Sequence, residues 1–340
     1  MRHASLADMC CPTCGTALQI TVAESESDNI VEGLLQCAGC SARYPIRKGI
    51  PYLLSADRMQ ASKVREMQGW VTLWEKRGMY DNPTLEDSYR LPYLGGEWVD
   101  VARMFDMALQ EMNLQGDEVI LDLGAGQAWA ARYFAEQGCR VFAVDIVADE
   151  QYGLGRSWAI MERAGVYFEP VLADGEDLPF FPGRFNIAFL SGALHHFERF
   201  DRVLEEIYRV LKPGGSFIAA AEPSVSARSR ERDVQALLEE TELGITERRP
   251  KVLQYWWALR RAGFNDIRID TFETHRASAS QIHDWVMALG RASFPEARPH
   301  RKMLVRLACD LILKLPHKWV GQSILQLTGG TLFLRAVKTC

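Results

Sequence analysis

The fold of this chain is decided by residues 119–145, which read VILDLGAGQAWAARYFAEQGCRVFAVD. An apolar run at 119–123 is followed by a glycine turn at 124–126, a helical stretch at 129–137 and a second apolar run that ends in Asp145. In a doubly wound α/β fold, such glycines let the backbone approach a nucleotide closely, and the acid accepts hydrogen bonds from ribose hydroxyls. The stretch therefore predicts the nucleotide-binding half of such a fold.

Two details of this stretch bear on the kind of nucleotide. A dinucleotide fingerprint, Gly-x-Gly-x-x-Gly, would need glycine or alanine at Trp129, where an indole ring does not fit. Asp122, two residues before the first glycine, is also not part of that fingerprint. Both details argue against a dinucleotide.

Residues 121–126 resemble the first motif of the class I S-adenosylmethionine (SAM)-dependent methyltransferases. Counterparts of the later motifs follow in order at 144–146, at 172–180, in a strand at 185–191, and in a helix at 205–211 that leads through Lys-Pro-Gly-Gly at 212–215 into a strand at 216–221. The third glycine of the family is Ala128 here. The resemblance covers residues 118–223. It implies an α/β, doubly wound, Rossmann-like methyltransferase sheet of seven strands.

The resemblance also implies a set of contacts with SAM. Asp145 would hold the ribose, Ile146 would pack on the adenine, and Asp174 would reach the exocyclic amine of the adenine. The expected cofactor-binding residues are Asp122, Gly124, Ala125, Gly126, Asp145, Ile146, Asp174, Gly175 and Ser191.

Three residues are candidates for proton transfer from a methyl acceptor. His195 and His196 follow the fourth strand, and Glu222 ends the fifth, so all three lie where an α/β sheet presents side chains to its ligand. A histidine can accept a proton near neutral pH. The alternative is that the histidines only line the pocket or cap the next helix.

Five of the eight cysteines lie in the first forty residues. Cys11 and Cys14 form one C-x-x-C knuckle, and Cys37 and Cys40 form a second, with residues 15–36 between them. Two knuckles supply the four thiolates of a tetrahedral structural zinc site, which leaves no open position for catalysis. Cys10 is left over, because Cys11 has the better spacing to Cys14. The alternative, a redox dithiol, would need only one pair beside a βαβ unit.

The segment after the second knuckle, 42–54, ends in Tyr-Pro-Ile, Gly-Ile-Pro and Leu-Leu. With the knuckles it resembles, over residues 9–54, a small zinc-ribbon family. The eukaryotic members of that family are activating subunits of tRNA, rRNA and release-factor methyltransferases. The resemblance implies a zinc ribbon at the N-terminus of the chain.

These patterns predict three parts: a zinc ribbon at 1–56, a helical linker or cap at 57–115, and a methyltransferase domain at 116–340. In the cap, apolar residues at helical spacing within 57–90 predict an amphipathic helix, and a second helix is expected at 98–112. The loop at 89–96 between them is either a lid over the substrate or a surface connector. The domain should continue with a helix at 251–263 and strands at 267–272 and 331–337.

A helical insertion is expected at about 274–328, before the last strand. Its segment 291–318 carries seven lysines and arginines against two acids. A basic amphipathic helix there would contact a membrane surface or grip an anionic substrate. A helix that packs on the domain with a solvated basic face would show the same pattern.

Composition bounds the partners. The net charge of −5 argues mildly against a dedicated nucleic-acid binder. There is no signal-like apolar segment at the start and no apolar run of about eighteen residues, so we expect a cytoplasmic protein.

The leading hypothesis is methyl transfer to an oxygen or nitrogen atom of a small molecule such as a sugar, a lipid-linked compound or a specialised metabolite. The alternatives are an RNA methyltransferase and a non-catalytic SAM-binding partner protein. The oligomeric state stays open.

Overall fold

The computed structural model describes residues 1–55, 61–77, 85–227, 229, 239–276 and 329–339, and positions 280, 281, 284, 285 and 288. The motif stretch forms β5 (Val119–Leu123), α4 (Trp129–Glu136) and β6 (Arg140–Asp145). The predicted order of strand, glycine turn, helix and strand is therefore confirmed.

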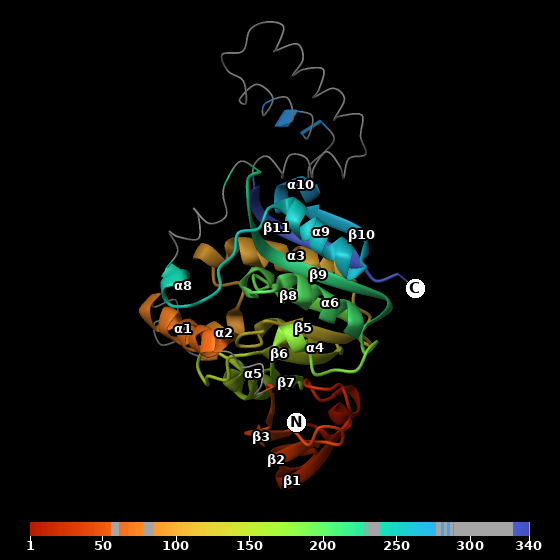
Figure 1. Ribbon diagram of the computed structural model, residues 1–340. Coiled ribbons are helices and arrows are strands. Elements are labelled where there is room, and N and C mark those ends of the chain that lie inside the picture. The colour runs from red at the N-terminus through yellow and green to blue at the C-terminus, as the bar shows by residue number, and fades with distance from the viewer. Residues whose placement is uncertain are drawn as a thin grey trace, which may run out of the picture.

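The described residues form one sheet of eleven strands (Figure 1). Seven belong to the predicted methyltransferase sheet, in the order β7-β6-β5-β8-β9-β11-β10, and only β11 runs antiparallel to both of its neighbours. The other strands of this part are β7 (Glu169–Ala173), β8 (Phe185–Ser191), β9 (Leu211–Val225), β10 (Asn265–Asp270) and β11 (Gly329–Val337). The predicted fold class is confirmed. The fifth strand is longer than the sequence predicts, because Leu211 already pairs with Phe185 before the register shifts at the Lys-Pro-Gly-Gly segment.

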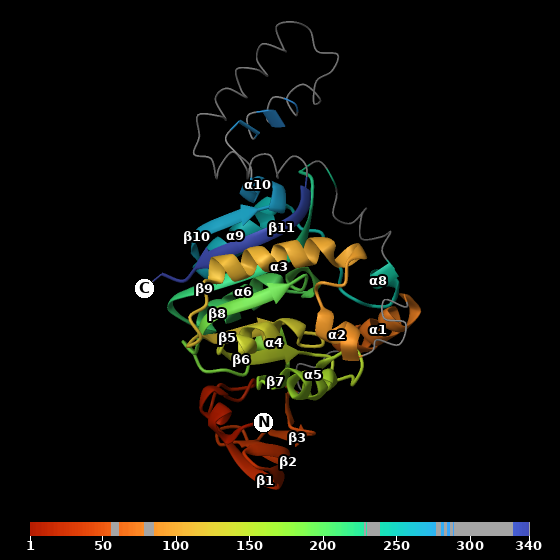
Figure 2. The ribbon, with the colours of Figure 1, turned by 180° about the vertical axis from the view of Figure 1, so that it is seen from behind.

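Helices cover both faces of this sheet. Alternate residues of a strand point to opposite faces, so Ile120 and Leu121 of β5 belong to two different hydrophobic cores. One core is completed by α6 (Phe200–Val210) and α9 (Val252–Ala262). The other is completed by α3 (Val99–Met112), α4 and α5 (Ser157–Ala164), and α3 crosses in front of the sheet in Figure 2.

The N-terminal part adds four strands to the same sheet. After the short helix η1 (His3–Asp8), an antiparallel meander is formed by β1 (Leu18–Glu26), β2 (Asn29–Cys37), β3 (Arg43–Arg47) and β4 (Ile50–Leu53). The last strand, β4, pairs in parallel with β7, with Tyr52 opposite Leu172 and Leu53 opposite Ala173. It thereby covers what would be an unpaired edge of the methyltransferase sheet.

Packing also joins the N-terminal part to the sheet. Buried residues of the ribbon, among them Leu35 and Tyr44, share one hydrophobic core with Phe142 and Phe180 of the methyltransferase part. The ribbon and the sheet are thus one packed body, although the sequence suggests two separate modules.

The predicted cap contains α1 (Ala61–Arg77), α2 (Leu85–Arg90), η2 (Gly96–Trp98) and α3. Shorter elements are η3 (Leu154–Arg156), η4 (Gly175–Asp177), η5 (Leu194–His196), α8 (Glu239–Glu242) and α10 (Phe272–Arg276). Most of the predicted insertion, including its basic segment 291–318, lies outside the described residues. Among the residues that are described, no helix is long and apolar enough to cross a membrane.

Candidate active site

A cavity of about 340 Å³ opens where β5, β6, β7 and β8 end. Its walls contain eight of the nine residues that the sequence predicts to bind the cofactor: Gly124, Ala125, Gly126, Asp145, Ile146, Asp174, Gly175 and Ser191. The remaining walls come from α1, η2, α3, α4, β9 and the segments after α2, β6, β7 and β8. Residues from distant parts of the chain therefore meet in one pocket of the size that small ligands occupy.

The glycine turn forms the floor of this cavity. Gly124 has a φ of +70°, and a Cβ there would lie 2.5 Å from the Cβ of Ala193, so no larger residue fits. Ala128 also adopts a left-handed conformation, with φ +60° and ψ +33°, directly before α4. The chain thus holds at Ala128 a conformation that favours glycine, which explains why a glycine is expected there.

Asp145 lies at the end of β6 and lines the cavity. Its carboxylate accepts hydrogen bonds from the backbone N–H groups of Gly126, at 2.8 Å, and Val147, at 2.9 Å. Burial raises the pKa of this carboxyl, and the backbone donors oppose that effect. The acid therefore ties the glycine turn to β6 and keeps lone pairs for a ligand.

Asp122 is the predicted cofactor residue that does not line the cavity. Its side chain is 2% exposed and accepts a hydrogen bond of 3.0 Å from the backbone N–H of Ala131, in α4. Burial, opposed by this bond, raises the pKa of Asp122 to about 7. The structure thus places Asp122 behind the glycine turn, where it connects β5 to α4.

Asp122→Asn is expected to change the pH dependence of stability. An acid whose pKa is raised in the folded state favours folding while it is protonated, and this contribution is lost as pH rises from its ordinary value near 3.8 to about 7. The melting temperature of the variant relative to the wild type should therefore rise between about pH 4 and pH 7 and level off above. Scanning calorimetry across this range checks it, and a pH-independent difference would contradict the assignment.

Asp174 follows β7 and meets a lysine that the sequence did not single out. Lys63 of α1 contacts the Asp174 carboxylate and lies 3.3 Å from Glu176. The carboxylate of Asp174 also accepts the backbone N–H of Glu176 at 3.0 Å. This ion-pair group fastens α1 over the cofactor end of the cavity. The two partners are 111 positions apart, so only the fold brings them together.

Glu222 and His195 lie behind the cavity wall rather than on it. Glu222 is fully buried and accepts hydrogen bonds from the backbone N–H groups of residues 193–195 and, at 2.8 Å, from Nδ1 of His195. The other ring nitrogen of His195 lies 3.4 Å from Glu247. Burial alone would lower the pKa of His195, but the two carboxylates raise it to about 9. The ion pair between His195 and Glu222 holds the turn after β8 in place.

His196 is the candidate base that lines the cavity. Its Nδ1 lies 2.8 Å from the backbone carbonyl of Thr246, which can only accept, so Nδ1 carries the proton. Burial and the neighbouring His195 lower the pKa of His196 to about 3. At neutral pH its Nε2 is therefore an unprotonated hydrogen-bond acceptor.

One face of α1 supplies most of the remaining wall. Lys63, Glu66, Trp70 and Trp74 follow one another at intervals of three or four residues and all line the cavity. The ring centroid of Trp70 lies 5.2 Å from that of Trp74 and 4.5 Å from that of His196. The sequence marks the tryptophans only as part of an apolar stripe. The charged residues on the same helical face are the signal that would have identified this face as a site.

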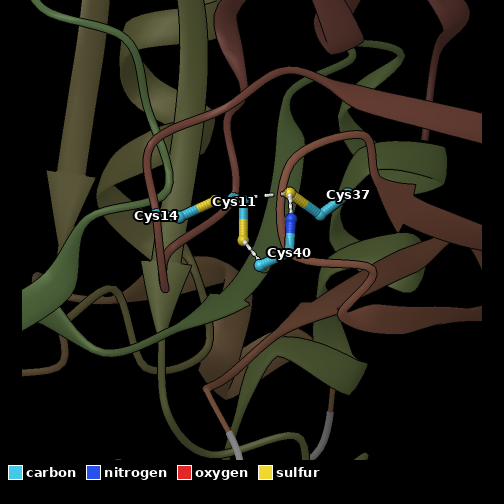
Figure 3. A group of neighbouring side chains, drawn as sticks. All are labelled: Cys11, Cys14, Cys37 and Cys40. Carbon is cyan, nitrogen blue, oxygen red and sulfur yellow. Dashed lines mark hydrogen bonds between the residues drawn. The ribbon is translucent and has the colours of Figure 1, made fainter.

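The four predicted metal ligands converge in the N-terminal part (Figure 3). Sγ of Cys11 lies 3.7 Å from that of Cys40, Sγ of Cys14 lies 3.4 Å from that of Cys37, and all four lie within 4.8 Å of one another. Zn–S bonds of about 2.3 Å in a tetrahedron place sulfurs about 3.8 Å apart. The backbone N–H groups of Gly39 and Cys40 point at Cys37 Sγ, as suits a thiolate. The geometry and donor set fit zinc.

Comparisons with known families match two parts of this chain. Residues 121–219 match the family described as "Methyltransferase domain", and residues 8–49 match the family described as "Trm112p-like protein". Residues 121–219 therefore carry a methyltransferase domain of the class I SAM-dependent type, and residues 8–49 carry a Trm112p-like domain that contains the four-cysteine cluster.

Similar proteins include two bacterial enzymes. The chain is 34% identical over 178 residues to a sarcosine/dimethylglycine N-methyltransferase of Halorhodospira halochloris, covering 52% of this chain and 59% of the relative. It is 30% identical to a glycine/sarcosine/dimethylglycine N-methyltransferase of Actinopolyspora halophila, covering 42% of this chain and 26% of the relative. The match thus spans less than two thirds of either relative.

A solved structure shows the same fold. Phosphoethanolamine N-methyltransferase 2 of Haemonchus contortus, in complex with SAM, superposes with a TM-score of 0.51 at 17% identity. The superposition covers 88% of this chain and 64% of that one. At this identity the likeness concerns the fold alone.

Proposed function

We propose that this chain binds SAM in the cavity and transfers its methyl group to an oxygen or nitrogen atom of a small-molecule acceptor. The observation that carries the proposal is that one cavity unites the cofactor motifs with the face of α1. The relatives named above support it, because their names specify small acceptors such as sarcosine and dimethylglycine.

The residues of the cavity divide into two groups. At the cofactor end, Asp145 would bind the ribose hydroxyls, Ile146 would pack on the adenine, and Asp174 would accept from the adenine amine beside Lys63. When bound, SAM supplies an electrophilic methyl group. The chain then has to bind the acceptor, align its nucleophilic atom and exclude water, which accounts for much of the rate enhancement in such transfers.

At the other end, His196 is the only one of the three candidate bases that reaches the cavity. Its Nε2 would accept a hydrogen bond from the acceptor, and it would orient the nucleophile rather than store a proton, because its pKa is lowered to about 3. His195 and Glu222 act as positioning residues for the turn that carries His196.

We also propose that Cys11, Cys14, Cys37 and Cys40 hold a structural zinc ion. Four protein ligands fill a tetrahedral site, so no position remains for water or substrate. The zinc would fix the two loops that precede β1 and β3, and thereby the meander that leads to β4.

The proposed activity predicts that the zinc-loaded chain, given SAM, releases S-adenosylhomocysteine only when a suitable small molecule is added. A coupled assay for S-adenosylhomocysteine, with panels of amines, sugars, lipid-linked sugars and RNA, measures this. Turnover with a small molecule supports the proposal. Turnover with RNA but with no small molecule would contradict the proposal and identify the protein as an RNA methyltransferase. Binding without turnover would favour a non-catalytic partner protein.

A further inference from the structure

We propose that the acceptor is a protonated primary or secondary amine, held by Trp70, Trp74 and Tyr152 and deprotonated by Glu66. This inference rests on the proposed methyl transfer and adds the chemical class of the acceptor. We call the three ring-bearing residues the aromatic wall.

The aromatic wall is continuous along the cavity. Trp74 lies between the other two members, with ring centroids 5.2 Å from Trp70 and 5.8 Å from Tyr152. All three residues line the cavity. Aromatic faces attract organic cations, and tryptophan does so most strongly. A wall of this kind therefore favours a cationic ligand over a neutral one of the same shape.

The charged side chains near the aromatic wall also favour a cationic ligand. Lys63 is the one cationic side chain among the described lining residues, and it is paired with Asp174 and Glu176. The backbone N–H of Thr246 lies near the carboxylate of Glu66, three residues further along α1, and favours its ionised form. A carboxylate offers about four lone-pair sites, so Glu66 keeps capacity for an ammonium donor. When the carboxylate of Glu66 is ionised, its negative charge lies next to the aromatic wall.

Thr246 links the two groups that would meet the reacting nitrogen. Its N–H lies near the Glu66 carboxylate, and its carbonyl accepts a hydrogen bond from Nδ1 of His196. One residue, Thr246, thus lies against both a carboxylate on α1 and an imidazole on η5. An ammonium group between them could donate one hydrogen bond to Glu66 and another to Nε2 of His196.

The protonation state of Glu66 suits this task. Burial raises its pKa to about 7; the Thr246 N–H and Lys63 oppose this, while Asp174 and Glu176 add to it. The neutral His196 also faces the site from η5. A carboxylate with a pKa near neutrality can take a proton from a bound ammonium and return it to solvent.

The step balances as follows. Glu66 takes one proton from the ammonium, and the freed nitrogen lone pair forms a bond to the methyl carbon. The carbon–sulfur bond of SAM breaks, and its electron pair stays on sulfur. The products are the N-methylated ammonium ion and neutral-sulfur S-adenosylhomocysteine. The proton on Glu66 then passes to solvent, so one proton is released per transfer.

Calorimetric titration of the full-length, zinc-loaded chain saturated with S-adenosylhomocysteine tests the proposal. The probe is choline, whose quaternary nitrogen cannot be methylated, and the control ligand is its neutral isostere 3,3-dimethylbutanol. We expect choline to bind about tenfold more tightly than the isostere, the size of a partly desolvated cation–π contribution. Equal binding of the two ligands, or no binding of choline, would overturn the amine assignment.

Variants separate the acceptor site from the cofactor site. Trp70→Leu and Glu66→Gln should each weaken choline binding about tenfold while the affinity for S-adenosylhomocysteine stays within about twofold of the wild type. The matched control is Trp257→Leu on α9, a residue that is 57% exposed and lies outside the cavity walls, and it should change neither affinity. If the wild type does not bind S-adenosylhomocysteine, the proposed function itself is refuted. Choline binding that is unchanged in both variants would refute only the amine site.

Discussion

Asp145→Ala is expected to abolish measurable binding of S-adenosylhomocysteine, with a loss of affinity of at least about 100-fold. The wild-type carboxylate would accept charge-assisted hydrogen bonds from two ribose hydroxyls, and each such bond contributes about 1.5–3 kcal/mol. Alanine also leaves the N–H groups of Gly126 and Val147 without their present acceptor, which loosens the glycine turn. Both effects act on the same ligand contact, so we expect the largest loss of cofactor affinity at this position.

Calorimetric titration measures this effect, and two controls make it specific. Asp100→Ala removes an exposed carboxylate of α3 that pairs with Arg103 outside the cavity walls, so it should leave the affinity unchanged. Asp145→Asn keeps an acceptor for Gly126 and should bind more tightly than the alanine variant. If the folded alanine variant binds like the wild type, the cofactor lies elsewhere in the molecule.

The part of this site that the sequence predicts is encoded locally. The glycine turn and Asp174 directly follow buried strands, Asp145 ends one, and the strand ends of a parallel sheet meet at one edge. The same holds for the cysteine knuckles, where each pair sits on one turn and only the two pairs have to find each other. Short-range patterns of this kind can be recognised in the sequence without any knowledge of tertiary contacts.

Other features depend on side-chain direction, which sequence spacing does not give. His195 and His196 are neighbours on η5, yet one ring is buried between two carboxylates and the other lines the cavity. Asp122 has the spacing of a cofactor contact, but its carboxylate points at the backbone of α4. Glu222 ends up satisfied by three backbone donors and a histidine. Sequence reasoning treats all of these as candidates for the same pocket.

Long-range pairing accounts for the rest. The contact of Lys63 with Asp174 and the parallel pairing of β4 with β7 both join segments more than one hundred positions apart. No periodic pattern in the sequence predicts either contact. The sequence therefore suggests a ribbon, a cap and a cofactor domain in series, whereas in the fold the ribbon extends the sheet at β7 and the cap and the cofactor domain line one cavity.

Cys37→Ser is expected to remove the metal and to lower the melting temperature of the whole chain by about 10 °C, the equivalent of several kcal/mol in a protein of this size. Cys37 is 2% exposed, ends β2 and belongs to the core that the ribbon shares with the methyltransferase sheet. Elemental analysis should find about one zinc per wild-type chain and none in the variant. The matched control is Cys10→Ser, a buried cysteine one position before the cluster, which should retain the zinc. Equal zinc content in both variants would contradict the four-cysteine site.

The same variant should weaken cofactor binding, although Cys37 lies outside the cavity walls. The reason is the order of elements: β4 pairs with the end of β7, where Leu53 lies opposite Ala173, and Asp174 is the next residue. A meander that loses its metal holds β4 less firmly, so the backbone that carries Asp174 gains freedom. We expect the affinity for S-adenosylhomocysteine to fall about tenfold in Cys37→Ser at a temperature where the chain is still folded. Unchanged affinity in a folded, zinc-free variant would mean that the metal stabilises the ribbon alone, and that β4 keeps its place through the shared hydrophobic core.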